Sequence, residues 1–401
     1  MKITKIEVIN ENINDKTSLV QIQTDTDIVG IGATASPVPV IKAIIELMEF
    51  NFSKTLEGTD PTDPSSLWDE MYRVLTGWGR YGDGGYIINA MAAIDMALWD
   101  IASKARKIPL YKLLGKPEQT KIMVYASTSR WDRLKIQRDG EMRLKGQSKS
   151  IEDIVLECNE HVSAGFKAIK FGWGNYFNKE AEDIIAAMRE SVGPDIKLML
   201  DYGCPAYLSP TANVKELTKI CDMLGKYDIY FLEEPLNPHD TENFALLTSI
   251  SPIKIATGES LTTLVDLKRF IDNKALDIIQ PDAQQIGITW FLEVMKLCES
   301  SGVLCIPHCP WTSIAVAAHL NILCTSSSPT MIEYPAFASF EKESDTSKQT
   351  HAMHNSITDF NLQVEDGYLA IPKQNGLGLG NYLNNFPATK PLPRNNDFGS
   401  Q

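Results

Sequence analysis

Residues 229–235 read IYFLEEP, a short apolar run that ends in two carboxylates and a proline. An apolar run of this length is typical of a strand that is buried on both faces of a parallel sheet. Seven further runs resemble it, and most of the eight starts lie roughly 25 to 45 residues apart, about the length of one strand and one returning helix. The expected strands are 122–126, 168–171, 197–200, 229–232, 253–256, 276–279, 303–306 and 330–332.

Eight strand–helix units predict an α/β fold that closes into a parallel TIM-type barrel, with its reactive groups at the C-terminal ends of the strands. The alternative is an open doubly wound sheet, which binds its ligand where the strand order reverses. The barrel is favoured because the units are similar and no nucleotide fingerprint accompanies them. Residues 77–82 (GWGRYG) do fit GxGxxG, but that motif needs a preceding strand, whereas residues 67–72 (LWDEMY) look helical.

The N-terminal part of the chain has a different pattern. Its first thirty residues alternate apolar and polar side chains as strands do, for example at residues 19–23 (LVQIQ). A helix is expected from about Tyr86 to Lys107, because apolar residues recur there at steps of four and three, and Pro109 then ends it. We therefore expect a small α+β domain that ends near Lys121, ahead of the barrel.

Composition argues against several classes of protein. The chain of 401 residues carries 38 Lys and Arg against 51 Asp and Glu, a net charge of −13, which disfavours a nucleic-acid partner. No apolar run approaches the roughly 20 residues that span a bilayer, and the N-terminus has no signal-peptide pattern. The seven cysteines are scattered without CxxC spacing, as in reduced proteins of the cytoplasm. We expect a globular cytoplasmic protein with no membrane and no nucleic-acid partner.

Acidic residues stand at the ends of successive expected strands. Asp201, Glu233, Glu259 and Asp282 follow the third to sixth strands, and His308 and Glu333 follow the seventh and eighth. In a parallel barrel these ends face one mouth, where converging carboxylates repel one another and a hard cation such as Mg²⁺ relieves the repulsion. The alternative is that each acid only caps the next helix, which stabilises that helix by about 0.3–1 kcal/mol. The succession along several strands favours a metal site.

Asp282 and His308 come from neighbouring expected strands. A carboxylate that accepts the N–H of one imidazole nitrogen raises the basicity of the other nitrogen, so this pair predicts a proton-transfer group. Lys170, near the end of the second strand, would direct a cation at the same mouth, where a substrate carboxylate would give it a partner. Pairing of Lys170 with one of the acids is the alternative.

These motifs together resemble the enolase superfamily, specifically its mandelate racemase branch. The resemblance covers nearly the whole chain, through AAIDMALWD at 92–100, LLG at 113–115, LD at 200–201, EEP at 233–235, GE at 258–259, QPD at 280–282 and PH at 307–308. It implies a modified (β/α)7β barrel at residues 122–361. It also implies an α+β capping domain that is formed by residues 1–121 and a C-terminal return at residues 362–401.

The resemblance also implies the roles of the site residues, by matching position. Asp201, Glu233 and Glu259 would bind Mg²⁺, Asp282 and His308 would form a base dyad, Lys170 would be the first lysine of a Lys-x-Lys motif, and Glu333 would hydrogen-bond the substrate carboxylate or the enediolate. Family members often assemble as homo-oligomers, so a homo-oligomer is expected.

The chain departs from the family pattern at Gly172, where the second lysine of the Lys-x-Lys motif would stand. A racemase that uses two opposed bases therefore looks disabled, and His308 as a single base predicts dehydration of an acid sugar, an aldonate or aldarate, to a 2-keto-3-deoxy acid. In one alternative, Tyr202 or a capping-domain residue removes the proton and His308 acts only as the acid. An epimerase, racemase or cycloisomerase with another second base, and an inactive scaffold of the same fold, are further alternatives.

Three segments complete the expectations. Residues 129–149 are polar and locally basic, as in a solvated loop, with recruitment of an anion as the alternative. In the resembled family the capping-domain loops choose the substrate, here residues 10–17 and 34–39.

Overall fold

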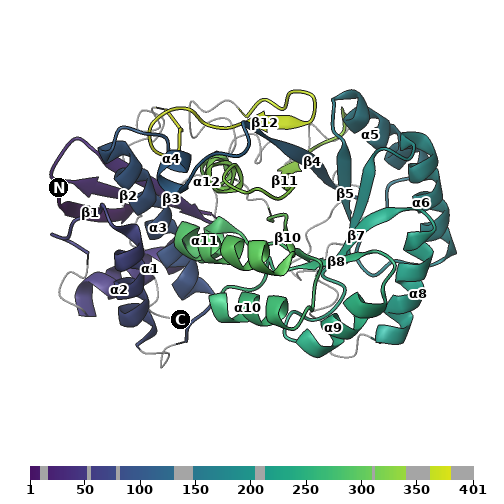
Figure 1. Cartoon of the computed structure of the whole chain (residues 1–401), viewed down its shortest axis with the longest axis horizontal. Helices are drawn as coiled ribbons and strands as arrows, with labels where there is room; N and C mark the ends of the chain where they lie inside the picture. The colour runs from purple at the N-terminus through teal and green to yellow at the C-terminus, as the bar shows by residue number, and fades with distance from the viewer. Residues whose placement is uncertain are drawn as a thin grey trace, which may run out of the picture.

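The computed structural model describes residues 1–9, 17–51, 56–77, 82–130, 148–203, 213–308, 312–339 and 362–380. It has two regions, a capping region with an antiparallel sheet and a larger curled parallel sheet surrounded by helices (Figure 1).

The capping region combines a three-stranded sheet with helices. Its strands are β1 (Ile3–Val8), β2 (Ser18–Thr24) and β3 (Val29–Thr34), in the order β1-β2-β3, and its helices are α1 (Val38–Asn51), α2 (Pro64–Thr76), α3 (Tyr86–Ala105) and α4 (Leu110–Leu114). Helix α3 lies so close to β3 that a Cβ at Gly32 would stand 1.9 Å from the carbonyl oxygen of Ala93. Only glycine allows this approach of helix and sheet.

The parallel sheet supplies the barrel. Its strands are β4 (Lys121–Ser129), β5 (Ala168–Gly172), β6 (Lys197–Asp201), β7 (Ile229–Glu233), β8 (Lys254–Thr257), β9 (Ile278–Ile279), β10 (Leu304–Cys305) and β11 (Met331–Pro335). They lie in the order β10-β9-β8-β7-β6-β5-β4-β11. Between the two ends of this order, the Thr330 hydroxyl donates a hydrogen bond to the Cys305 carbonyl over 2.6 Å. Together with the seven helices between these strands, the described residues confirm the expected (β/α)7β barrel under a cap.

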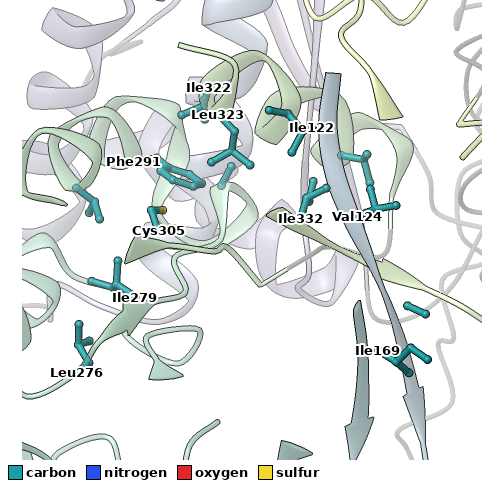
Figure 2. Packing of buried hydrophobic residues seen from close by; sticks show 14 of the residues in the cluster. Ile122, Val124, Ile169, Leu276, Ile279, Phe291, Cys305, Ile322, Leu323 and Ile332 are labelled. Atoms are coloured by element: carbon teal, nitrogen blue, oxygen red, sulfur yellow. The ribbon is translucent and has the colours of Figure 1, made fainter. Parts of the chain in front are cut away.

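The barrel helices follow the strands in sequence and cover the outside of the sheet (Figure 1). They are α5 (Ile151–Ser163), α6 (Lys179–Val192), α8 (Val214–Gly225), α9 (Thr241–Ile250), α10 (Leu264–Asp272), α11 (Ala283–Ser301) and α12 (Ser313–Leu323). Outward-facing strand residues such as Ile279 and Ile332 belong to one buried cluster with Phe291 of α11 (Figure 2). This cluster is the main core of the barrel.

The inward faces of the strands form a second, smaller cluster. Each strand, or the residue just after it, contributes one member: Tyr125, Ala168, Met199, Phe231, Ala256, Ile278, Ile306 and Met331. Because side chains alternate along a strand, the residue two positions further faces the same interior. That next layer consists of Ser127, Lys170, Asp201, Glu233, Gly258, Gln280, His308 and Glu333. An apolar floor therefore lies directly beneath a polar layer at the C-terminal ends of the strands.

The C-terminal segment contacts both regions. Strand β12 (Tyr368–Ala370) pairs antiparallel with β4, while the Leu377 N–H donates to the Asp100 carboxylate of α3 over 2.9 Å. The domain boundaries at 121, 122, 361 and 362 stay predictions.

Several details differ from the sequence expectations. Strands β9 and β10 are two residues long, shorter than the expected runs at 276–279 and 303–306, and α3 ends at Ala105 rather than Lys107.

Residues 67–72 lie in helix α2, as expected, so the strand that a dinucleotide motif would need does not precede Gly77. Residues 10–16, 78–81, 131–147 and 381–401 lie outside the described residues, and with them most of the basic segment and one proposed specificity loop. No described helix is long and apolar enough to cross a membrane.

Candidate active site

Lys170 lies at the centre of the barrel mouth, almost fully buried. Its Nζ is 2.7 and 2.9 Å from the two carboxylate oxygens of Glu233, 3.1 Å from Oε1 of Glu333 and 3.9 Å from Oδ2 of Asp201. Burial alone would lower the pKa of Lys170, but the charges of Glu233 and Glu333 raise that pKa well above its ordinary value. Lys170 is therefore a buried ammonium group that three carboxylates surround.

Burial and neighbouring charges make Asp201 and Glu259 harder to ionise. Burial and the charge of Glu233 raise the pKa of Asp201 well above its ordinary value, although Lys170 opposes the rise. Burial also raises the pKa of Glu259, where His308 opposes the rise and the neighbouring carboxylates add to it. The side chains of Asp201 and Glu259 keep 28% and 29% of their surface exposed, so a ligand from solvent can reach both. Asp201 and Glu259 are therefore open to a positively charged ligand.

The expected dyad is present. His308 Nδ1 lies 3.0 Å from Oδ2 of Asp282, and His308 Nε2 lies 3.9 Å from Oε2 of Glu259. Burial alone would lower the pKa of His308, but the charge of Glu259 and the hydrogen bond to Asp282 raise that pKa well above its ordinary value. The Asp282 carboxylate is fully buried and also accepts the Gln284 backbone N–H at the start of α11 over 2.8 Å. His308 thus directs its second nitrogen toward the carboxylate cluster.

Glu333 is fixed from two sides. The hydroxyl of Ser127 donates a hydrogen bond to its Oε1, and the Lys170 ammonium lies 3.1 Å from the same atom. Both neighbours belong to the inward layer of the barrel. Glu333 therefore faces the mouth, as expected from its place at the end of β11.

Sequence reasoning assigned no role to Glu234. This residue is buried, has a φ of 47°, and accepts a hydrogen bond from the Ser260 hydroxyl. A positive φ is uncommon for a residue other than glycine, and such strained residues gather at functional sites. The charge of Glu234 also raises the pKa of both Asp201 and Glu259. The second carboxylate of the EEP motif was the available signal.

The position of the missing second lysine has room for a side chain. A Cβ at Gly172 would meet the Thr128 carbonyl oxygen at 3.5 Å and Ser129 Oγ at 3.8 Å, both ordinary contacts. Sterics therefore do not require glycine there. The ring of Tyr202, which was considered as a second base, stacks on Phe177 with centroids 5.8 Å apart, and burial raises its pKa.

The carboxylates suit a magnesium ion by chemistry but are not assembled around one. Within the described ranges, no three His, Cys, Asp or Glu side chains are gathered so that they could hold a metal ion, and Glu233 is turned to Lys170. Asp201 and Glu259 are oxygen donors whose pKa values are raised by burial and by neighbouring carboxylates, and such donors fit a hard divalent cation, which would relieve the repulsion. Asp201, Glu233 and Glu259 are the residues that would hold it.

Comparison with known families agrees with this geometry. Residues 153–381 match the family described as enolase C-terminal domain-like, and residues 9–115 match the mandelate racemase / muconate lactonizing enzyme N-terminal domain. The chain belongs to the enolase superfamily, in its mandelate racemase branch. The two matches correspond to the barrel and to the cap.

Two kinds of enzyme are found among the relatives of this chain. The chain is 30% identical to a D-galactonate dehydratase of Pectobacterium atrosepticum, over 80% of this chain and 78% of that protein. It is 27% identical to a D-galactarolactone cycloisomerase of Agrobacterium fabrum, over 90% and 88%. The crystal structure of a 3,6-anhydro-D-galactonate cycloisomerase from Zobellia galactanivorans has a TM-score of 0.76 and 29% identity, and the match covers 94% of this chain and 96% of that one. This superfamily member is an enzyme, and its relatives support the lyase class, with a cycloisomerase as the alternative.

Proposed function

We propose that the protein dehydrates an acid sugar, an aldonate or aldarate, to a 2-keto-3-deoxy acid, with Mg²⁺ held by Asp201, Glu233 and Glu259. The observation that carries this proposal is the His308–Asp282 pair, which faces the carboxylate cluster while glycine stands at the position of an opposed lysine. One strong proton-transfer group suits elimination better than inversion at a carbon atom, which uses a base on each face.

The proposed reaction uses His308 twice. Its Nε2 removes the proton α to the substrate carboxylate, and the resulting imidazolium then gives that proton to the β-hydroxyl as the C–O bond breaks. Water leaves, and the enol that remains tautomerises to the 2-keto acid. Asp282 holds the proton of His308 on Nδ1, which leaves Nε2 free to act as the base.

The other mouth residues bind and orient the substrate. The Lys170 ammonium attracts the substrate carboxylate, and Glu333, held by Ser127, donates a hydrogen bond from its protonated carboxyl group to the substrate carboxylate or the enediolate. When bound, Mg²⁺ supplies positive charge that stabilises the enediolate dianion formed by loss of the α-proton. The apolar floor beneath this layer limits access of water from below.

Cycloisomerisation of a sugar-acid lactone or anhydro sugar is the second candidate, which the named relatives in Agrobacterium and Zobellia favour. That reaction also begins with removal of an α-proton, but it closes or opens a ring without releasing water. In a second mechanistic alternative, Tyr202 or a capping residue removes the proton and His308 serves only as the acid.

A screen against a sugar-acid library with Mg²⁺ tests the proposal, with products followed by ¹H NMR in D₂O. The expected result is loss of the α-hydrogen signal together with new signals of a 3-deoxy carbon. Exchange of the α-hydrogen without loss of water would replace the dehydratase with an epimerase, and an isomer of the substrate would replace it with a cycloisomerase. An unchanged library would contradict all three activities.

A further inference from the structure

We propose that His319 is a positioning residue that aligns Asp282 for His308 by accepting the Ala283 backbone N–H at its Nε2 atom. The role of the aligned pair rests on the proposed function, whereas the alignment itself can be measured without any substrate. His319 touches none of the reacting atoms, and sequence analysis assigned it no role.

His319 lies in the middle of α12 and is fully buried. Its Nε2 accepts a hydrogen bond from the Ala283 N–H over 2.9 Å. Ala283 is the first residue of α11 and directly follows Asp282. On α11, the ring of Phe291 packs against the imidazole edge-on, with centroids 5.4 Å apart at an angle of 72°. The imidazole is therefore held on one side by packing and on the other by the Ala283 hydrogen bond.

The hydrogen bond decides which donors the Asp282 carboxylate meets. The first N–H groups of a helix have no partner within the helix and need an acceptor from elsewhere. Asp282 Oδ1 accepts the Gln284 N–H, and Oδ2 faces Nδ1 of His308. Without His319, the Ala283 N–H would have this same carboxylate as its neighbouring acceptor. Turning the carboxylate toward Ala283 would move Oδ2 away from His308.

The same bond keeps His319 from competing with His308. Its Nε2 lies only 3.6 Å from Oδ1 of Asp282, so a proton on that nitrogen would give the carboxylate a second imidazole donor. The Ala283 N–H occupies the lone pair and leaves the neutral ring with its proton on Nδ1. Burial lowers the pKa of His319 to about 4, against the charge of Asp282, which agrees with a neutral ring.

The arrangement leaves the other ring nitrogen of His319 without a hydrogen bond to any described residue. Nδ1 of His319 is buried and has no hydrogen-bond partner among the described residues. Most buried polar groups are satisfied, so one that is not calls for an explanation. The explanation here is that the Ala283 N–H fixes the tautomer at Nε2, which leaves the Nδ1 proton without an acceptor in the described part of the chain, on a ring that packs against Phe291.

The tautomer can be read from ¹⁵N NMR of the imidazole nitrogens in the full-length protein with MgCl₂ and no substrate. We expect His319 to be neutral, with its proton on Nδ1, throughout the pH range 6–8. We also expect a slowly exchanging Nδ1 proton on His308, because Asp282 accepts it. A proton on Nε2 of His319, or a charged His319 ring, would overturn the proposal.

Three variants separate positioning from packing. His319→Gln keeps an acceptor near the place of Nε2, His319→Phe keeps the bulk without an acceptor, and Leu320→Ala removes buried volume from the same helix without touching the hydrogen bond. For His319→Phe we expect kcat to fall about ten- to hundredfold, the range for loss of a group that orients a functional one, with KM unchanged. Exchange of the His308 Nδ1 proton should also become at least about tenfold faster. His319→Gln should keep kcat and the exchange rate of the His308 Nδ1 proton close to their native values. Leu320→Ala should lower the thermal stability alone.

The outcomes distinguish this inference from the proposed function. If no acid sugar is turned over, the function fails, and the His308 exchange rates still decide the positioning role. If turnover is found but His319→Phe leaves kcat and the exchange rate as in the native protein, the positioning role is wrong and the function stands. If His319→Phe does not fold, the ¹⁵N tautomer and the His319→Gln variant decide the matter.

Discussion

Buried carboxylates serve two regions of this protein in opposite ways. Where the cap meets the barrel, Asp95 of α3 accepts hydrogen bonds from the Thr289 N–H and hydroxyl over 2.9 and 2.6 Å. Asp100 on the same helix accepts from two backbone N–H groups and from Lys104. At the barrel mouth, by contrast, Asp201 and Glu259 repel their neighbours and share one lysine and one histidine.

The difference separates structural acids from those with a proposed function. In the joint between cap and barrel each carboxylate has its own donors, which offset part of the loss of hydration and tie α3 to its neighbours. At the mouth Asp201 and Glu259 are short of donors, and under the proposed function a bound cation and substrate would offset the cost in stability. Substitutions in the joint should therefore change the stability of the protein, whereas substitutions at the mouth should change turnover or Mg²⁺ affinity.

The largest effect is expected for His308→Asn, which removes the proposed base from the mouth. Turnover should fall by at least about 10³-fold, within the range for loss of a general acid–base group, while Mg²⁺ affinity measured by calorimetry stays nearly unchanged. His239→Asn, at an exposed histidine, is the matched control. Activity retained in His308→Asn would show that the base lies elsewhere.

Asp100→Ala should have the next largest effect, on stability alone. It leaves Lys104 and the N–H groups of Ile31 and Leu377 without their shared acceptor, so the free energy of unfolding should fall by about 3 kcal/mol. The value of kcat should not change. Asp272→Ala, in the exposed pair with Lys268, should cost less than about 1 kcal/mol. Urea unfolding of both variants measures the two losses. Equal losses of unfolding free energy would contradict a stabilising role for Asp100 in the joint.

Glu259→Gln should weaken Mg²⁺ binding about ten- to hundredfold by calorimetry, because it removes one charged oxygen donor. In the absence of Mg²⁺ the same variant should be no less stable than the native protein, since it relieves repulsion at the mouth. Glu293→Gln, which breaks an exposed pair with Lys296 on α11, is the control and should bind Mg²⁺ normally. Unchanged affinity in Glu259→Gln would remove Glu259 from the ligand set.

The smallest expected effect is a pH dependence of the stability that arises from Asp95 in the joint between cap and barrel. Burial raises the pKa of Asp95 to about 7 in the folded protein, against its hydrogen bonds with Thr289, whereas the unfolded value is 3.8. At a pH between these two pKa values, Asp95 carries a proton in the folded state but not in the unfolded state. The stability therefore falls as the pH rises through this window and levels off above pH 7. Between pH 6 and pH 8 the native protein should lose about 1.4 kcal/mol relative to Asp95→Asn. Parallel pH dependences of the two proteins in thermal unfolding would show that Asp95 does not titrate in this range.

The sequence was sufficient for those features that depend on local pattern. Eight apolar runs at regular spacing predict the barrel, and the alternation of side chains brings Lys170, Asp201 and Glu233 to one inward layer without any tertiary information. The pair formed by Asp282 and His308 follows in the same way, because each stands just beyond the end of a neighbouring strand.

Other features depend on packing between elements far apart in the chain. His319 stands in mid-helix, and its contact with Ala283, 36 residues away, depends on how α12 lies against α11. The left-handed backbone of Glu234 turns a second carboxylate toward the cluster, and glutamate rarely adopts that conformation. The pairing of Glu233 with Lys170 likewise depends on side-chain geometry in the folded protein.

The most direct test follows the α-hydrogen of a turned-over acid sugar by ¹H NMR in D₂O, with native protein and His308→Asn, each with MgCl₂ and with EDTA. Loss of the α-hydrogen signal and formation of a 3-deoxy product are expected only for the native protein with Mg²⁺. Formation of that product in EDTA, or at the native rate by His308→Asn, would contradict proton removal by His308 beside a cation held at the barrel mouth.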